Sequence, residues 1–140
     1  MKKFSQEHQE TLETGTKNLL QAIGDDPNRD GLLETPKRVA KAYAEIFSAT
    51  GETQFDNYKL FPTDHDSDMV IVADIPFYAM CEHHLLPFFG TVTVGYVPDG
   101  EIIGLSKIPR LVDWAARRPS VQENLTALIC SEMQRIVHPK

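Results

Sequence analysis

The sequence predicts an α+β fold, and three observations indicate it. Four segments carry apolar residues at helical spacing, and two segments in the middle of the chain have strand character. Clusters of Gly, Pro, Asp and Asn separate these segments, as expected for turns. The chain has 140 residues, 41% of them hydrophobic, which is enough for a domain with its own core.

The first part of the chain is predicted to be helical. Ser5 is a suitable N-cap for a helix that continues to about Gly24. Thr35-Pro36 fits the N-cap and the first turn of a second helix, which Gly51 is expected to end. Residues 52–68 are polar and irregular in pattern, so we expect a surface connection there.

The strands are predicted in the middle of the chain. Residues 69–75 are rich in β-branched side chains, and residues 91–97 alternate between apolar and polar positions. Pro98-Asp99-Gly100 is a turn sequence, and residues 101–104 form a short further strand or the end of the hairpin. A two-stranded ribbon is marginal in water. We therefore expect other subunits or further chain to cover its edges.

Two more helices are expected after the strands. Ser106 can cap a helix that runs to about Ala116, with Pro109 in the first turn, where a helix tolerates proline. Ser120 begins the last helix, whose apolar stripe includes Ile129.

Composition and charge exclude several classes of protein. No apolar run approaches 18 residues, and no apolar stretch follows the first lysines, so we expect neither a membrane span nor a signal peptide. Without a signal peptide, a cytoplasmic location is the default expectation. The two cysteines fit thiols in a reducing compartment. The formal net charge of -6 argues against nucleic-acid binding. Residues 106–140 are locally basic, which suits either a small anion or an ordinary solvated helix face.

The densest cluster of reactive side chains is Cys81-Glu82-His83-His84. A Cys-x-x-His spacing suits tetrahedral Zn²⁺, but a catalytic zinc needs three protein ligands. The alternative is a buried cysteine beside two surface histidines at a strand end. If Cys81 and His84 bind metal, the side chain of His83 points elsewhere and suits proton transfer. Considered by itself, His83 is more simply interpreted as an exposed polar residue. We expect Cys130, within the last helix, to be a small buried residue.

Two further clusters suit binding of a small molecule. Ser106, Lys107 and Arg110 share the first turn of a predicted helix, where free N–H groups attract anions. Their alternative role is helix capping with solvated charges. In Ser120-Val121-Gln122-Glu123, serine and glutamate fit a capping box, whereas the amide and carboxylate could instead read the donor edge of a purine.

Taken together, four motifs identify a family. TPKRVAK at 35–41, CEHH at 81–84, GLSK at 104–107 and VQE at 121–123 resemble GTP cyclohydrolase I, and the resemblance covers residues 8–138. It implies a tunnelling fold (T-fold) whose subunits assemble into a β-barrel ring, usually a decamer. The implied reaction converts GTP and water to formate and 7,8-dihydroneopterin triphosphate, the first step of pterin and folate synthesis.

The resemblance also implies roles for individual residues. Cys81 and His84 would ligate Zn²⁺, which activates a water for attack at C8 of the purine. His83 would shuttle protons, and Gln122 and Glu123 would hold the guanine. The triphosphate would be held by Ser106, Lys107 and Arg110, together with Arg38 and Lys41 from a neighbouring subunit.

The same resemblance divides the chain and marks a departure from the family. Residues 1–66 would be the N-terminal helical region, and 67–140 the catalytic portion of the T-fold. The family has a further C-terminal hairpin with a His-x-Cys element, which supplies a third zinc ligand and a second catalytic histidine. That hairpin is missing from this sequence, so we expect the chain by itself to bind zinc weakly and to have little activity.

The alternative is a non-catalytic or regulatory relative that assembles with intact subunits. A different T-fold enzyme acting on a pterin or deazaguanine fits the motifs less well.

Overall fold

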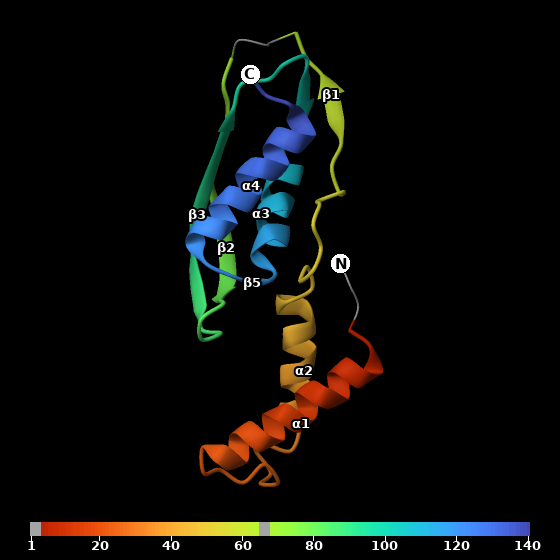
Figure 1. The fold of residues 1–140 in the computed structure, drawn as a ribbon, viewed down its shortest axis with the longest axis vertical. Coiled ribbons are helices and arrows are strands. Elements are labelled where there is room, and N and C mark those ends of the chain that lie inside the picture. Colours follow the sequence, from red (N-terminus) through yellow and green to blue (C-terminus); the bar gives the residue numbers. More distant parts are fainter. Residues whose placement is uncertain (1–3, 65–67) are drawn as a thin grey trace. The chain divides into compact units, whose positions relative to one another are not determined.

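The computed structural model describes residues 4–64 and 68–140. The chain forms two compact units, residues 1–48 and 49–140, which are described separately below. Within the described residues there are four helices and two sheets built mainly from antiparallel strands, which confirms the predicted α+β class (Figure 1). None of the helices in these ranges has both the length and the hydropathy needed to cross a bilayer.

The first unit consists of two helices packed on each other, α1 (Gln6–Ala22) and α2 (Thr35–Ile46). Ser5 caps α1 as predicted, in a reciprocal capping box with His8. Thr35 is not the N-cap of α2, so that prediction is wrong. The preceding residue, Glu34, already has helical φ and ψ, and the Thr35 N–H donates to a carbonyl three residues back, so the turn begins earlier.

The second unit is built on a long antiparallel hairpin of β2 (Val70–Cys81) and β3 (Pro87–Tyr96). Both strands extend beyond the predicted segments, towards the turn that joins them. Prolines and a glycine weaken the strand pattern there, but cross-strand aromatic contacts compensate. Phe77 lies edge-on to Phe88 with ring centroids 5.8 Å apart, and Tyr78 stacks on Phe89 at 6.0 Å.

Three short strands complete the sheets. β1 (Leu60–Pro62) pairs with β4 (Glu101–Ile103), and β5 (Pro119–Ser120) pairs in parallel with the end of β2. The short strand at 101–104 is therefore confirmed, whereas β1 lies in a segment expected to be irregular. The resemblance assigns residues 49–64 to the N-terminal helical region. In the structure they belong to the second unit, where Phe55 is buried in the core.

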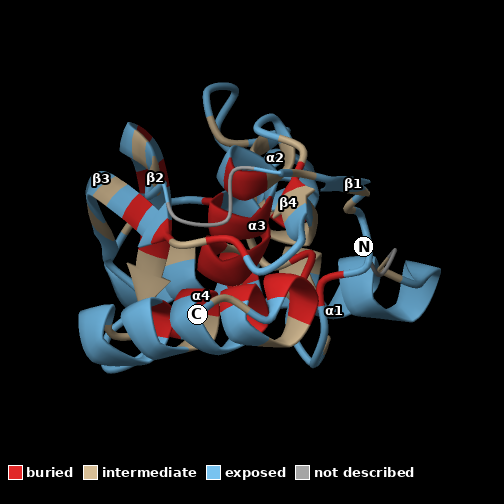
Figure 2. Ribbon diagram, turned by 90° about the horizontal axis from the view of Figure 1, so that it is seen from above, coloured by how far each residue is buried: buried red, intermediate tan, exposed pale blue. Residues whose placement is uncertain are grey.

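Helices α3 (Lys107–Ala116) and α4 (Gln122–Val137) supply the rest of the core. Figure 2 shows α3 as the most completely buried element of this unit, with the β2–β3 hairpin on one side. Its inward residues Ile108, Leu111 and Val112 are fully buried. The surrounding core residues come from β2, β3, β4 and α4 and from the segment before β1 (Phe55, Ile75, Phe77, Val94, Tyr96, Ile103, Leu125, Ile129 and Met133).

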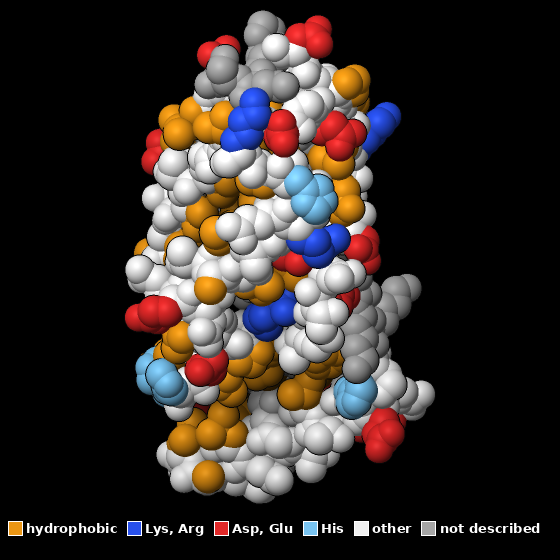
Figure 3. Space-filling model, turned by 45° about the horizontal axis from the view of Figure 1, so that its top comes forward, with side chains coloured by type: hydrophobic (Ala, Val, Ile, Leu, Met, Phe, Trp, Pro, Cys, Tyr) orange, Lys and Arg blue, Asp and Glu red, His pale blue; other side chains and the backbone are white. Residues whose placement is uncertain are grey.

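The other face of the hairpin leaves large apolar side chains exposed. Tyr78 and Phe89 are 75% and 73% exposed although they stack on each other. Hydrophobic side chains also reach the surface in groups on the face drawn in Figure 3. Contiguous exposed apolar surface of this kind is typical of a protein–protein contact.

Candidate functional site

The hairpin turn between β2 and β3 presents the Cys81-Glu82-His83-His84 cluster. Two hydrogen bonds close the turn, from the Cys81 N–H to the Leu86 carbonyl and from the Leu85 N–H to the Cys81 carbonyl, both 2.8 Å long. Leu85 adopts a left-handed conformation with φ of 56°, which is costly for a leucine. Strain of this kind persists where surrounding bonds fix the backbone, as the two hydrogen bonds of this turn do.

Within the turn, the thiol and both imidazoles are accessible. Cys81 is half-buried, and His83 and His84 are exposed. Cys81 Sγ lies 3.8 Å from Nδ1 of His83, while Nδ1 of His84 accepts a hydrogen bond from the Leu86 N–H at 3.2 Å. The alternative of a fully buried cysteine therefore does not apply to Cys81.

The start of α4 lies directly beside this turn. β5 places Ser120 opposite Cys81, and the Glu82 N–H donates to the Ser120 carbonyl at 2.9 Å. Gln122 and Glu123 follow at once as the first two residues of α4, and both are exposed. The two clusters, 40 residues apart in the sequence, therefore share one end of the second unit (Figure 1).

The capping-box interpretation of this segment is wrong. Val121 is the N-cap of α4, and no side chain caps the helix, because valine has no acceptor atom and Ser120 lies one residue too early. The Ser120 hydroxyl instead donates to the Val121 carbonyl at 3.2 Å. The first N–H groups of α4 thus have no side-chain partner within the helix, and the Glu123 carboxylate is not used as a cap. This leaves both Gln122 and Glu123 available to a ligand.

The predicted anion cluster lies at the start of α3. Ser106 precedes the helix but makes no capping hydrogen bond, so its predicted capping role is wrong. Its backbone is already helical, with φ of -65° and ψ of -12°, which turns the hydroxyl away from the capping position. Lys107 donates through Nζ to Oδ1 of Asn57 at 3.1 Å, and Arg110 is exposed one turn further on.

The structure does not bring all the predicted residues together in one copy. The start of α3 and the Cys81 turn lie at opposite ends of α3, because β5, which pairs with Cys81, follows the helix's last turn (Figure 1). At 1.5 Å per residue, α3 separates them by roughly 14 Å. Arg38 and Lys41 lie in the first unit, three residues apart on α2 and both exposed.

Comparison with known proteins now decides the family. The sequence model of the family described as GTP cyclohydrolase I matches residues 12–140. The chain belongs to the GTP cyclohydrolase I family. It is 56% identical over 137 residues to "GTP cyclohydrolase 1" of Lactiplantibacillus plantarum, covering 97% of this chain and 72% of the relative. The corresponding protein of Enterococcus faecalis is 52% identical over 138 residues, covering 98% of this chain and 74% of the relative. These relatives are longer than this chain.

As a member of the GTP cyclohydrolase I family, the chain can be tested for its fit to zinc. A thiol with imidazole nitrogens is the donor set that zinc prefers, and these groups lie on one tight turn. In the ranges 4–64 and 68–140, however, no three His, Cys, Asp or Glu side chains converge. Cys81 and His84 therefore fit zinc in the kind of donor atom, but they are one fewer than the three protein ligands that a catalytic zinc site needs.

Cys130 is not the buried residue that the sequence predicts. It is exposed on α4, where it lines an apolar pocket of about 330 Å³ between α4 and β3. Its neighbours Ile129 and Met133 occupy the buried stripe of the helix, which leaves Cys130 beside the stripe rather than on it.

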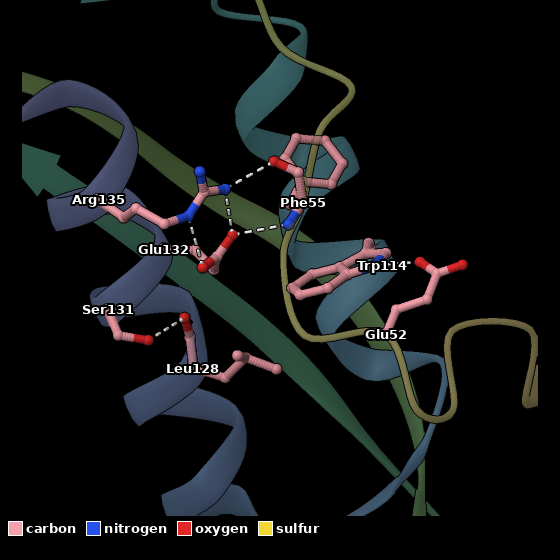
Figure 4. A network of polar contacts seen from close by, with 7 residues as sticks. All are labelled: Glu52, Phe55, Trp114, Leu128, Ser131, Glu132 and Arg135. Carbon is pink, nitrogen blue, oxygen red and sulfur yellow. Dashed lines mark hydrogen bonds and ion pairs between the residues drawn. The ribbon is translucent and has the colours of Figure 1, made fainter.

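Several residues that stabilise the fold around the site were not predicted from the sequence. The buried Glu132 carboxylate accepts from the Phe55 N–H and from Arg135, and Glu52 accepts from the Trp114 indole N–H (Figure 4). The Glu132–Phe55 and Glu52–Trp114 hydrogen bonds each join positions more than 60 residues apart in the sequence, whereas Glu132 and Arg135 are both in α4. No local pattern signals such contacts, and Asn57 beside Lys107 was missed for the same reason.

Proposed function

We propose that this chain has GTP cyclohydrolase I activity, in which GTP and water give formate and 7,8-dihydroneopterin triphosphate. One observation carries the proposal: the turn with Cys81, His83 and His84 adjoins the exposed Gln122-Glu123 start of α4. The residues proposed to bind metal and to transfer protons thus lie beside groups that suit a purine edge. The names of the relatives agree with this activity. We also propose that the second unit is a T-fold, which its long hairpin and two helices resemble.

Gln122 and Glu123 are proposed to hold the guanine. The edge of guanine presents an N1–H and an exocyclic amino group, both donors, and a carboxylate accepts two such bonds. Adenine lacks the N1–H and has a ring acceptor there instead. Because no cap occupies Glu123, its carboxylate can select guanine over adenine.

Cys81 and His84 are proposed to hold Zn²⁺. When bound, the metal would supply Lewis acidity that makes a water reactive near neutral pH. His83, on the same turn, is proposed to move protons during opening of the five-membered ring, since a neutral imidazole both accepts and donates protons near pH 7. A catalytic zinc needs one more protein ligand than this pair, and the described residues of a single copy bring no third donor to it.

The triphosphate site is proposed to form between copies of the chain. Ser106, Lys107 and Arg110 lie at the far end of α3 from the guanine-binding residues, and Arg38 and Lys41 lie in the other unit. A homo-oligomer, for which we propose a decamer, would bring the two ends together and add Arg38 and Lys41. The exposed Tyr78–Phe89 face supports such assembly.

Removal of either proposed ligand is expected to abolish zinc binding. Cys81→Ala and His84→Ala each delete one donor from an already incomplete set, so metal content should fall at least about tenfold. Cys130→Ala removes an exposed thiol away from the turn and serves as the matched control. Metal analysis after dialysis at fixed free zinc measures this. Retention of zinc by Cys81→Ala, or its loss from Cys130→Ala, would refute the assignment.

A non-catalytic role is the second candidate, and the lack of three converging donors among the described residues favours it. Assays with zinc and GTP in excess separate the candidates, because weak metal binding then no longer limits turnover. Formate release supports the enzyme. GTP binding without formate release supports a subunit that acts only in assembly with others.

A further inference from the structure

Residues 55–59, here called the strap, precede β1 in the second unit. Hydrogen bonds connect both ends of the strap to other elements of that unit. At one end, the Phe55 N–H donates to Oε2 of Glu132 at 2.7 Å, and the Phe55 carbonyl accepts from Arg135 at 2.9 Å (Figure 4). At the other end, the Lys59 carbonyl accepts from the Gly104 N–H at 3.0 Å. The strap is therefore tied to α4 and to the turn that leads into α3.

The glycine in that turn allows the strap to approach closely. A Cβ atom at Gly104 would lie 3.3 Å from the Phe61 ring and 3.7 Å from the Lys59 carbonyl oxygen. Only a residue without a side chain fits there at no cost to its neighbours. The Gly104–Lys59 backbone hydrogen bond therefore holds the end of the strap against the turn that leads into α3.

Between these two ties, Asn57 faces the start of α3. Its Oδ1 accepts a hydrogen bond from Nζ of Lys107 at 3.1 Å, across 50 positions of sequence. A lysine side chain has four rotatable bonds and loses much freedom when it is held in one place. Because the strap backbone is tied on both sides of Asn57, the amide stays within reach of Lys107, and the hydrogen bond restricts Lys107 before any ligand arrives.

From this geometry we infer that Asn57 is a positioning residue, which holds the Lys107 ammonium in place for the phosphates of the substrate. The inference rests on the proposed function, in which Lys107 binds the triphosphate. A neutral amide oxygen suits this task, since it takes one of the three N–H donors and leaves the positive charge and two donors for phosphate. An aspartate at the same place would neutralise that charge.

Binding measurements test the role. Asn57→Ala should weaken the binding of GTP and of inorganic triphosphate by about 3- to 10-fold, the size of one lost hydrogen bond. It should raise KM and leave kcat within about twofold, because the effect is on binding alone. Asn57→Gln keeps the amide and should recover most of the affinity, whereas Asn57→Asp should not. Gln54→Ala, an exposed neighbour outside the strap, is the matched control and should behave as wild type.

A double-mutant cycle distinguishes positioning from general damage to the fold. In a Lys107→Ala background, Asn57→Ala should have no further effect on triphosphate affinity, because its target is gone. A loss of equal size in both backgrounds would overturn the inference.

A second measurement does not depend on the nucleotide. The rate of acylation of Lys107, followed by peptide mass spectrometry, should rise about two- to threefold in Asn57→Ala and stay constant for Lys41, which lies outside the contact. Unchanged labelling of Lys107 would overturn the positioning role, whatever the GTP affinity. Failure of the wild-type protein to bind GTP or triphosphate would instead contradict the proposed function, even where labelling shows the contact.

Discussion

Replacement of His83 by alanine is expected to lower formate release from GTP by about 10²- to 10⁴-fold, the usual contribution of a general acid–base group. His83 lies exposed on the turn between β2 and β3, with Nδ1 3.8 Å from Sγ of Cys81. Zinc content should stay unchanged, because the proposed ligands Cys81 and His84 remain. The measurement is formate release with zinc and GTP in excess, together with metal analysis of the same preparation.

His138 offers a matched control for this variant. It is a histidine at the opposite end of α4 from the site, and its left-handed backbone tolerates asparagine, so His138→Asn should keep wild-type turnover. The proton-transfer role is contradicted if His83→Ala retains turnover within about threefold of wild type. Loss of zinc from His83→Ala would instead make His83 a ligand.

Replacement of Arg135 by alanine is expected to destabilise the second unit by about 3 kcal/mol, because it leaves the buried Glu132 carboxylate without its ionic partner. The Glu132 side chain is 6% exposed and Arg135 Nη2 lies 2.7 Å from its Oε2. The same guanidinium also donates to the Phe55 carbonyl, so the strap loses one of its ties. Urea unfolding at pH 7 measures the change in the free energy of unfolding.

The pair of half-buried Arg117 and exposed Asp113 supplies the control for this prediction. Asp113→Ala removes a carboxylate that is 59% exposed, and we expect a loss of at most about 0.5 kcal/mol. If Arg135→Ala costs no more than Asp113→Ala, the Glu132–Arg135 pair does not hold the fold.

The same pair makes stability depend on pH. Burial of Glu132 raises its pKa, but hydrogen bonds from Arg135 and the Phe55 N–H outweigh burial, so the pKa lies below its ordinary value. The stabilisation is therefore present above the unfolded-state pKa of about 4.3 and is lost as the pH falls through the lower folded-state pKa. We expect the free energy of unfolding to fall more steeply below pH 5 in wild type than in Arg135→Ala, as urea titrations at successive pH values would show.

The helices and the main hairpin were predictable because their signals are local. Apolar spacing, Ser5 as a cap and β-branched runs each act within a few residues, and all four helices were found. The extension of β2 and β3 was not predictable, since aromatic pairs across the strands compensate for prolines in the sequence. β1 and β5 are too short for a pattern, and only their partners define them.

The site was predictable in its residues but not in its arrangement. The motifs name Cys81, His83, Gln122 and Glu123, but the parallel pairing of β5 with β2 brings them together. From the sequence, Ser120 and Glu123 fit a capping box. The N-cap is Val121 instead, so local capping propensity did not determine where this helix begins. Contacts such as Asn57 with Lys107 depend on the whole fold and leave no local signal.

The start of α4, beside the Cys81 turn, is proposed to be a guanine site. Calorimetric titration of His83→Ala with GTP and with ATP, in excess zinc, tests it without turnover. We expect GTP to bind at least about tenfold more tightly than ATP, and we expect Glu123→Gln in the same background to remove the difference. Equal affinity for the two nucleotides, or a preference for GTP that survives Glu123→Gln, would contradict it.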